Sequence, residues 1–286
     1  MAFMTSIIEA EEALRRHAEG AQFVDGTWRL ADGAVSAQAT FARSHIPGAV
    51  FFDIDDVSDR ESDLPHMLPT PEAFAEAAGD MGLSEQRPIV VYDQDGVFSA
   101  ARVWWTLKTM GAANVAVLNG GLPAWLDANG AMSTEQNSAS SEKFGAQFAS
   151  ERLSSLDRTL QAVKTGDALI LDARPADRFR GAAPEPRPGL ASGAMPGAVS
   201  LPVSVIAPNG RLPSPADTRR ALEAVGWRAD RPTITTCGSG VAASLLALAI
   251  EHAGGPPAAV YDGSWAEWGR GRAPDGRTLP IVRDEA

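Results

Sequence analysis

An internal repeat constrains this chain more than any other feature of its sequence. An apolar run at residues 89–92 leads into Asp93 and a helical pattern, and a similar run at residues 233–236 leads into Cys237 and a second helical pattern. Asp93 and Cys237 are 144 positions apart. In a chain of 286 residues, such self-similarity predicts two copies of one domain.

Two further pairs of segments match in the same order. The polar segments that begin at Asn119 and Asp262 each follow a short apolar run and are 143 positions apart. The Pro-Gly-Ala-Val sequences that begin at Pro47 and Pro196 are 149 positions apart. Three matches at nearly one spacing are not a chance result, and they support the duplication.

The repeat also predicts the domain boundaries and the fold class. We expect a first domain at residues 1–135, a linker rich in Ser, Ala and Gln at residues 136–150, and a second domain at residues 151–286. Each copy alternates short strands with helices, which favours an α/β fold with a mainly parallel sheet flanked by helices. Binding sites in such sheets form at the carboxyl ends of strands, which is where Cys237 is expected.

The charge balance narrows the class of partner. The chain carries 25 Lys and Arg residues against 36 Asp and Glu residues, a formal net charge of −11. So acidic a protein is a poor candidate for binding nucleic acid, and an anionic substrate needs a local cationic patch. No apolar run approaches the ~20 residues that span a bilayer, and the first residues lack the pattern of a secretory signal. We therefore expect a cytoplasmic protein without membrane contact.

Cys237 is the only cysteine, which excludes an internal disulfide and a cysteine-based metal cluster. A lone cysteine is often only a small buried apolar residue. Here Gly238 and Gly240 follow it and a predicted helix begins, so that backbone N–H groups and the helix N-terminus converge on the thiol. This arrangement stabilises a thiolate and predicts a nucleophile.

Two other interpretations of the cysteine loop are disfavoured. Residues 238–243 fit the Gly-x-Gly-x-x-Gly/Ala dinucleotide fingerprint, but the match directly follows a cysteine, lies near the end of the chain and has no counterpart in the first copy. A cysteine phosphatase needs an arginine that closes the loop on phosphate, and residues 238–244 contain none.

Residues 237–243 resemble the active loop of the 3-mercaptopyruvate sulfurtransferases, a group within the rhodanese superfamily. The chain departs from the family pattern at Ala242, where Thr is usual, and at Ala194, where His is common. Further segments that look like family segments extend the resemblance over nearly the whole chain; they are residues 45–49, 51–55, 66–69, 178–181, 184–187 and 261–265.

The resemblance implies two tandem rhodanese-like domains, of which only the second is catalytic. The first would be empty because Asp93 stands in the place of Cys237, and a carboxylate cannot accept sulfane sulfur as a thiolate does. Cys237 would carry a persulfide, and no metal or organic cofactor would be required. The residues expected to cradle the persulfide are Gly238, Ser239, Gly240, Val241 and Ala242.

Arg178 and Arg187 are the candidate substrate-binding residues. By resemblance they hold the carboxylate and ketone of mercaptopyruvate, and the planar guanidinium group suits a carboxylate. Arg180 lies between them and is the weaker candidate. The alternative is that both are solvated loop arginines.

The resemblance also implies a relay that assists Cys237. In it Asp55 orients the imidazole of His66, which polarises the hydroxyl of Ser239. A structural role for His66 in a proline-rich loop is the alternative. His45 precedes Ile-Pro-Gly and is interpreted as a turn residue.

The loop composition predicts the sulfur donor. Rhodaneses that prefer thiosulfate have a loop resembling Cys-Arg-Lys-Gly, whereas Gly238 and Ser239 are uncharged here. A neutral loop favours a monoanionic donor, so the predicted reaction transfers sulfur from 3-mercaptopyruvate to a thiol, thioredoxin or cyanide and releases pyruvate. The alternatives are a thiosulfate sulfurtransferase and a noncatalytic sulfur-carrier or regulatory binding module.

Overall fold

The computed structural model describes residues 5–29, 35–135 and 141–283, and it divides the chain into two compact units. Residues 136–140 of the predicted linker lie outside the described residues. The first unit comprises Met1–Arg60, Leu68–Ser150 and Asn209–Leu212, and the second comprises Glu61–Met67, Glu151–Pro208 and Pro213–Ala286.

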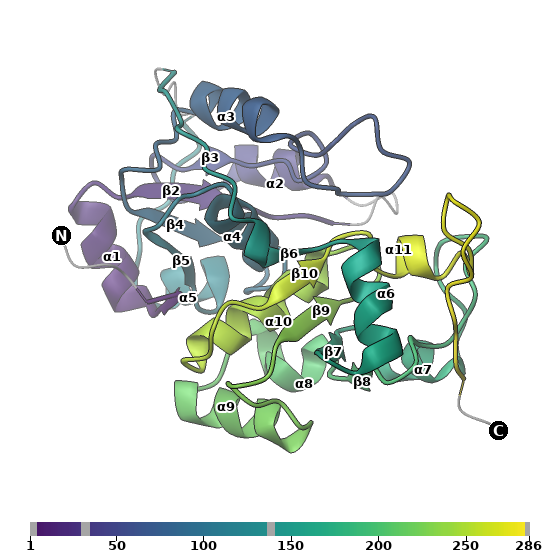
Figure 1. Ribbon diagram of the computed structural model, residues 1–286. Coiled ribbons are helices and arrows are strands. Elements are labelled where there is room, and N and C mark those ends of the chain that lie inside the picture. The colour runs from purple at the N-terminus through teal and green to yellow at the C-terminus, as the bar shows by residue number, and fades with distance from the viewer. Residues whose placement is uncertain (1–4, 30–34, 136–140, 284–286) are drawn as a thin grey trace. The chain divides into compact units, whose positions relative to one another are not determined.

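The first unit contains five strands and five helices among its described residues (Figure 1). The strands are β1 (Ile7–Ile8), β2 (Gln22–Asp25), β3 (Val50–Phe51), β4 (Ile89–Tyr92) and β5 (Val115–Leu118). The helices are α1 (Ala10–Ala18), α2 (Ala37–Arg43), α3 (Pro71–Asp80), α4 (Ala100–Thr109) and α5 (Gly121–Asp127).

The second unit repeats this pattern with one additional short helix. Its strands are β6 (Leu153–Ser154), β7 (Leu169–Asp172), β8 (Val199–Ser200), β9 (Thr233–Thr236) and β10 (Ala259–Tyr261). Its helices are α6 (Leu156–Thr165), α7 (Ala176–Arg180), α8 (Val203–Ile206), α9 (Pro215–Ala224), α10 (Val241–His252) and α11 (Ser264–Trp268). Two 3-10 helices, Ser150–Arg152 and Pro208–Gly210, lie where the chain passes from one unit to the other.

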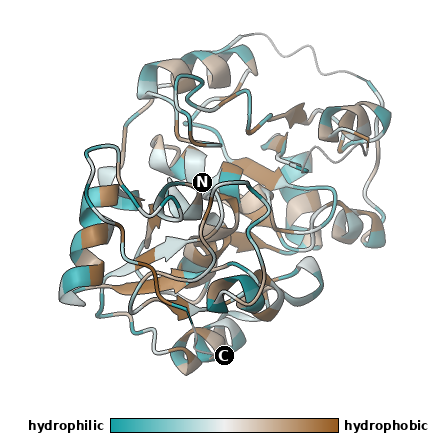
Figure 2. Ribbon diagram, turned by 90° about the vertical axis from the view of Figure 1, so that its right-hand side faces the viewer, coloured by the Kyte–Doolittle hydropathy of each residue, from teal (hydrophilic) through white to brown (hydrophobic). Residues whose placement is uncertain are grey.

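The two sheets have the same topology. The strand order is β1-β5-β4-β2-β3 in the first unit and β6-β10-β9-β7-β8 in the second, and every neighbouring pair is parallel. The predicted α/β class with parallel sheets is confirmed. Figure 2 shows hydrophobic residues on strands and on parts of the helices, as expected for sheets that helices bury.

Helices cover both faces of the second sheet. On one face, α6 and α11 pack on side chains from alternate positions of the strands, with Ile234 and Trp265 in the same apolar cluster. On the other face, α10 packs on β9 and against α8 and α9. Only a short turn joins β9 to α10, so the N-terminus of α10 lies at the carboxyl end of β9.

Matching helix caps show that the repeat extends to local structure. Thr70 and Ser214 occupy the N-caps of α3 and α9, and their hydroxyls accept the N–H groups of Ala73 and Asp217. A proline follows each cap at the first helical position, where its missing N–H costs nothing. The same start signal therefore begins the equivalent helix in each unit.

Two short segments each belong to one unit, although their neighbours in sequence belong to the other unit. In the first unit, Leu212 exchanges hydrogen bonds with the side chain of Asn119, at 2.9 Å in both directions. In the second unit, Asp63 forms an ion pair with Arg270 at 2.7 Å. The segments Asn209–Leu212 and Glu61–Met67 are thus integral parts of these units.

Residues 141–150, the described part of the predicted linker, pack along the first unit. Phe144 is buried and packs edge-on against Phe74, with ring centroids 5.2 Å apart. The backbone N–H groups of Glu142 and Gln147 donate to carbonyls of Gly79 and Met110. This part of the chain is therefore a packed strap.

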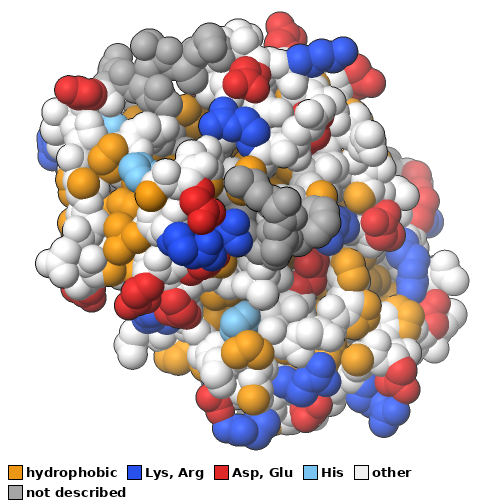
Figure 3. Space-filling view, turned by 90° about the vertical axis from the view of Figure 1, so that its left-hand side faces the viewer, with side chains coloured by type: hydrophobic (Ala, Val, Ile, Leu, Met, Phe, Trp, Pro, Cys, Tyr) orange, Lys and Arg blue, Asp and Glu red, His pale blue; other side chains and the backbone are white. Residues whose placement is uncertain are grey.

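The surface mixes charges of both signs. On the face shown in Figure 3, Lys and Arg side chains lie beside Asp and Glu side chains. Within the described residues, no helix has both the length and the apolar character that crossing a membrane requires.

Candidate active site

Cys237 directly follows β9, and three residues separate it from the first residue of α10. Its side chain is buried, with 3% of the residue exposed. Gly240 caps α10 in the left-handed region, at φ +84°, a conformation that favours glycine. The first N–H groups of a helix have no intrahelical acceptor, so Val241 and Ala242, which begin α10, bring such groups to the loop.

Backbone and side-chain hydrogen bonds fix the loop around Cys237. The N–H of Ser239 donates to Sγ of Cys237 at 3.4 Å, and this contact is the first element of the predicted cradle. The hydroxyl of Ser264 accepts the N–H groups of Cys237 and Gly240, at 3.2 and 3.1 Å. The N–H of Trp265 donates to the Cys237 carbonyl at 2.9 Å. The N-terminal turn of α11 therefore fixes the backbone of the cysteine loop.

Ser264 lies at φ +49°, which is unusual for a residue with a side chain. Its counterpart in the first unit is Gly121, where a Cβ would lie 2.3 Å from the carbonyl oxygen of Asp93. The second unit thus has room for a hydroxyl at a position where the first unit requires glycine.

The first unit shows what an anion does in this loop. The carboxylate of Asp93 accepts the backbone N–H groups of four residues, Asp95, Gly96, Ser99 and Ala100. Burial raises the pKa of Asp93, and these amides act in the opposite direction because they stabilise the charged form. The loop geometry of the repeat therefore directs several backbone N–H groups at the side chain that stands in the position of Cys237.

The two predicted substrate-binding arginines lie beside the cysteine loop. A Cβ placed on Gly238 would be 3.4 Å from Nη2 of Arg178 and 3.9 Å from Nη1 of Arg187. Arg187 forms no hydrogen bond or ion pair within the described residues. The structure therefore brings Cys237, Arg178 and Arg187 together within the second unit.

Arg178 ends a chain of buried charges that the sequence analysis missed. Asp172, the last residue of β7, binds the guanidinium of Arg174 through both carboxylate oxygens. Arg174 donates from Nη1 to Glu185 at 2.8 Å, and Arg178 binds the other oxygen of Glu185 through Nε and Nη2. The side chains of Asp172, Arg174 and Glu185 are at most 2% exposed. Glu185 lies between two prolines in the family segment 184–187, two residues before Arg187, but no role was predicted for it.

The charge of Arg174 is strongly favoured despite its burial. Burial opposes the cation, but the carboxylates of Asp172 and Glu185 outweigh it and raise the pKa of Arg174. The guanidinium also lies 3.9 Å above the ring of Trp265 and donates to the Gly193 carbonyl. Arg174 therefore connects the charge chain to α11, the helix that supports the cysteine loop.

A pocket of about 310 Å³ opens beside Arg187 in the second unit. It is lined by Asp63, Pro65, Arg187, Pro188, Gly189, Leu190, Ala266 and Arg270. Arg270 is paired with Asp63, so Arg187 is the lining cation that has no carboxylate partner within the described residues. The pocket is large enough for a small carboxylic acid.

The members of the predicted relay lie in different units. Asp55 belongs to the first unit, is exposed, and accepts the indole N–H of Trp28 at 3.0 Å. His66 belongs to the second unit, is buried, and has a left-handed backbone at φ +61°. Ser239 is buried next to Cys237. The relay stays a prediction.

His45 has a structural environment, as its interpretation as a turn residue suggests. Its ring nitrogens contact the carbonyl oxygens of Phe41 and Glu135, and its backbone pairs with Ser133. The counterpart Ala194 pairs with Val282 in the same way, although it has no ring.

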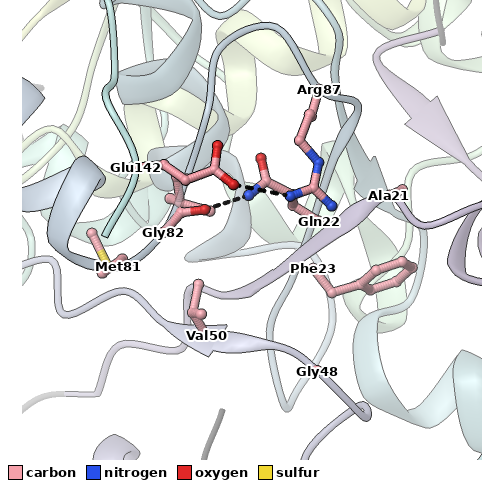
Figure 4. Close-up of a pocket in the computed structure, with 10 residues that line it drawn as sticks. Ala21, Gln22, Phe23, Gly48, Val50, Met81, Gly82, Arg87 and Glu142 are labelled. Carbon is pink, nitrogen blue, oxygen red and sulfur yellow. Dashed lines mark hydrogen bonds and ion pairs between the residues drawn. The ribbon is translucent and has the colours of Figure 1, made fainter. Parts of the chain in front are cut away.

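A second pocket, of about 230 Å³, lies in the first unit beside the first residues of β2 and β3 (Figure 4). The side chain of Gln22 donates to the Gly82 carbonyl at 2.6 Å, and Arg87 is 3.6 Å from Glu142. The pocket contains none of the predicted site residues, and these polar groups are paired with one another or with the backbone. It does not contribute to the candidate active site.

Comparison with known proteins agrees with the repeat. The model of the rhodanese-like domain matches residues 10–128 and again residues 155–270. The 3-mercaptopyruvate sulfurtransferase of Escherichia coli K12 is 40% identical over 234 residues, which is 80% of this chain and 82% of that protein. The human 3-mercaptopyruvate sulfurtransferase is 37% identical over 262 residues, covering 90% and 88% of the two chains.

The fold is similar to that of a solved relative. The crystal structure of SseA from Escherichia coli superposes with a TM-score of 0.82 and 33% identity, over 92% of this chain and 99% of that one. Both the duplicated family match and these relatives extend over most of the sequence. The chain therefore belongs to the rhodanese-like family and carries two copies of its domain.

Proposed function

We propose that this protein is a 3-mercaptopyruvate sulfurtransferase in which Cys237 carries the transferred sulfur. The observation that supports it most is the position of Arg178 and Arg187 beside Gly238, next to the only cysteine. A guanidinium pair binds a carboxylate, and a cysteine at a helix N-terminus is a nucleophile. The curated relatives named above have this activity in their names.

The proposed first half-reaction takes sulfur from the donor. The donor's carboxylate binds Arg187 and Arg178, and the thiolate of Cys237 attacks the donor sulfur. A sulfur–sulfur bond forms as the carbon–sulfur bond breaks, and the electron pair leaves with pyruvate as its enolate. The enolate takes a proton from water or from the hydroxyl of Ser239. The cradle residues Gly238, Ser239, Gly240, Val241 and Ala242 surround the outer sulfur, and backbone N–H groups of this loop other than that of Gly240, which Ser264 accepts, stabilise it.

The second half-reaction passes the sulfur on. The thiolate of an acceptor attacks the outer sulfur of the persulfide, the sulfur–sulfur bond breaks, and Cys237 returns as a thiolate. We propose a small thiol, a reduced thioredoxin or cyanide as acceptor. The relay of Asp55, His66 and Ser239 would assist proton transfer in this cycle.

The first domain, at residues 1–135, has a structural role in this proposal. Asp93 fills the loop there with its own carboxylate, so that no sulfur is carried. The sulfur is carried by residues 151–286, and the first half of the chain contributes only Asp55 and His66 of the proposed relay. A cytoplasmic location remains a prediction.

Thiosulfate is the competing donor. Gly238 and Ser239 add no charge beside Cys237, and a compact dianion would gain from cations there. Steady-state kinetics with mercaptopyruvate and thiosulfate in parallel test the proposal. We expect a higher kcat/KM for mercaptopyruvate, with pyruvate formed in equal amount to the sulfur transferred. A higher value for thiosulfate would make the protein a thiosulfate sulfurtransferase, and no turnover with either donor would support a noncatalytic binding module.

A further inference from the structure

The charge chain at the site is balanced, and this has a consequence for donor choice. It joins two carboxylates, Asp172 and Glu185, to two guanidinium groups, Arg174 and Arg178. The charges of these four side chains therefore sum to zero. Its last member, Arg178, reaches the cysteine loop, but Glu185 already matches its charge.

Arg187 is different, because it has no carboxylate partner within the described residues. A donor that approaches Gly238 therefore meets two guanidinium groups whose charge, after Glu185 is counted, is about +1, and the Cys237 thiolate subtracts one further charge for either donor. Such a site matches a donor with one negative charge. It gives a dianion no corresponding advantage, since the second charge of the dianion would have no net positive partner.

We propose that Glu185 determines which class of donor the site accepts: it holds Arg178 toward the cysteine loop and neutralises its charge, so that a monoanionic donor is favoured over a dianionic one. The proposal rests on the proposed function and extends it to a specificity-determining residue. Glu185 does not touch the reacting atoms and acts through Arg178.

The repeat supports a role beyond folding. Asp25, the counterpart of Asp172 in the first unit, binds the side chains of Thr27 and Gln94. The position that corresponds to Arg174 is Thr27, so the first unit folds into the same topology with uncharged partners for its aspartate at this place. The charged version occurs in the unit that has the cysteine.

The central test is the donor ratio of Glu185→Gln, which removes one negative charge and keeps the size of the side chain. The ratio of kcat/KM for thiosulfate to that for mercaptopyruvate should rise roughly tenfold, since the dianion gains one additional charge interaction at an effective dielectric constant of about 20. Equal changes for both donors would mean that Glu185 only supports the fold, and would overturn the proposal.

Two further variants separate charge from geometry. Glu185→Asp keeps the charge but shortens the reach to Arg178, so both kcat/KM values should fall while their ratio stays within about twofold. Arg174→Gln combined with Glu185→Gln restores neutrality and leaves both proposed substrate-binding arginines in place, so its ratio should return toward that of the native protein. A ratio that stays high in the double variant would contradict the charge argument.

A matched control is available in the same unit. Glu251 lies on α10 and pairs with Arg152 at 2.6 Å, with side-chain exposures of 15% and 9%. Glu251→Gln also removes the carboxylate of a mostly buried Arg–Glu pair, but near the C-terminal end of α10 and away from Cys237. It should lower stability and leave the donor ratio unchanged. A rise equal to that of Glu185→Gln would show that the ratio reports destabilisation.

The native protein provides a test that needs no variant. Sulfate and methanesulfonate share a tetrahedral head and differ in charge, so their competitive inhibition constants report the preference for one or two charges. At matched ionic strength, the inhibition constant of methanesulfonate should be no higher than that of sulfate. An inhibition constant for sulfate that is lower by tenfold or more would overturn the proposal. If the native protein does not turn over mercaptopyruvate, the proposed function fails, whereas the anion preference can still be measured as the rise in Tm with each anion.

Discussion

The hydroxyl of Ser264 accepts the backbone N–H of Cys237 at 3.2 Å and so fixes the nucleophile to the first turn of α11. The same oxygen accepts the N–H of Gly240 and donates to the Tyr261 carbonyl. One buried hydroxyl thus joins the start of the cysteine loop, its end and the strand before α11. The residue that sets the loop is far from Cys237 in sequence.

Ser264→Ala should lower both stability and activity. It leaves two buried N–H groups without their acceptor, which costs about 1–3 kcal/mol of unfolding free energy, and it loosens the loop that presents the thiol. Chemical denaturation and kcat/KM measure the two effects. Ser244→Ala is the matched control, because the Ser244 hydroxyl donates to the Gly240 carbonyl, which keeps the Ser244 N–H as a donor when the hydroxyl is removed. Equal losses in both variants would contradict a special role of Ser264.

Cys237→Ser should abolish sulfur transfer, because a hydroxyl forms no persulfide. Native protein incubated with mercaptopyruvate and no acceptor should gain about 32 Da, the mass of one sulfur atom, as expected for a covalent intermediate. Intact mass spectrometry measures the adduct. Continued turnover by the serine variant would show that the nucleophile is another group.

Arg187→Ala should lower kcat/KM for mercaptopyruvate by about 1.5–3 kcal/mol of transition-state stabilisation, the scale of a charged hydrogen bond, and Arg178→Ala should lose a similar amount. Arg187→Lys keeps the charge but not the planar fork, so its loss should be larger for mercaptopyruvate than for thiosulfate. Steady-state kinetics with both donors measure this difference. Equal losses in Arg187→Lys would rule out recognition of a carboxylate by Arg187.

Gly238→Arg combined with Ser239→Lys should shift the preference toward thiosulfate. The new side chain at position 238 would start 3.4 Å from Nη2 of Arg178, so two cations would be added where a dianion must approach. The quantity to measure is the ratio of the kcat/KM values for the two donors. If that ratio stayed at its native value, donor choice would reside in Arg178, Arg187 and Glu185 alone.

Asp93→Asn should destabilise the protein without removing its activity. An amide cannot accept all the N–H groups that the carboxylate accepts, and its own N–H₂ would face other donors, at a cost of about 1–3 kcal/mol. The midpoint of unfolding should fall while kcat/KM stays within about twofold. Loss of turnover at unchanged stability would place Asp93 in the chemistry.

The repeat made most of the fold predictable from sequence. The matches at Asp93 and Cys237 and at Asn119 and Asp262 mark equivalent strand ends, and the two sheets have one topology. The family resemblance is confirmed by the duplicated domain match and the named relatives. Cys237 could be predicted as the nucleophile from its local context, because a cysteine between a strand and a glycine-rich helix start is visible in a short stretch of sequence.

The surroundings of Cys237 were less predictable. Glu185 and Arg174 contact each other through side chains from segments that no sequence periodicity connects. The sequence also does not show whether an arginine is buried or exposed to solvent. Ser264 was noticed only as part of a family segment, because its positive φ depends on the packing of α11. Long-range electrostatic contacts are the part of a site that pattern and spacing do not determine.

The exchange of short segments between the units has a consequence for the order of synthesis. Asn119 obtains its partner Leu212 only after most of the second half has been made, whereas Asp63 is made long before its partner Arg270. A ribosome that has finished residue 150 therefore carries a first unit without one of its pieces, together with a piece that belongs to the other unit. The two halves are duplicated in sequence, but each unit is completed by a short segment from the other half, so a cut between the halves would leave each unit without one of its segments.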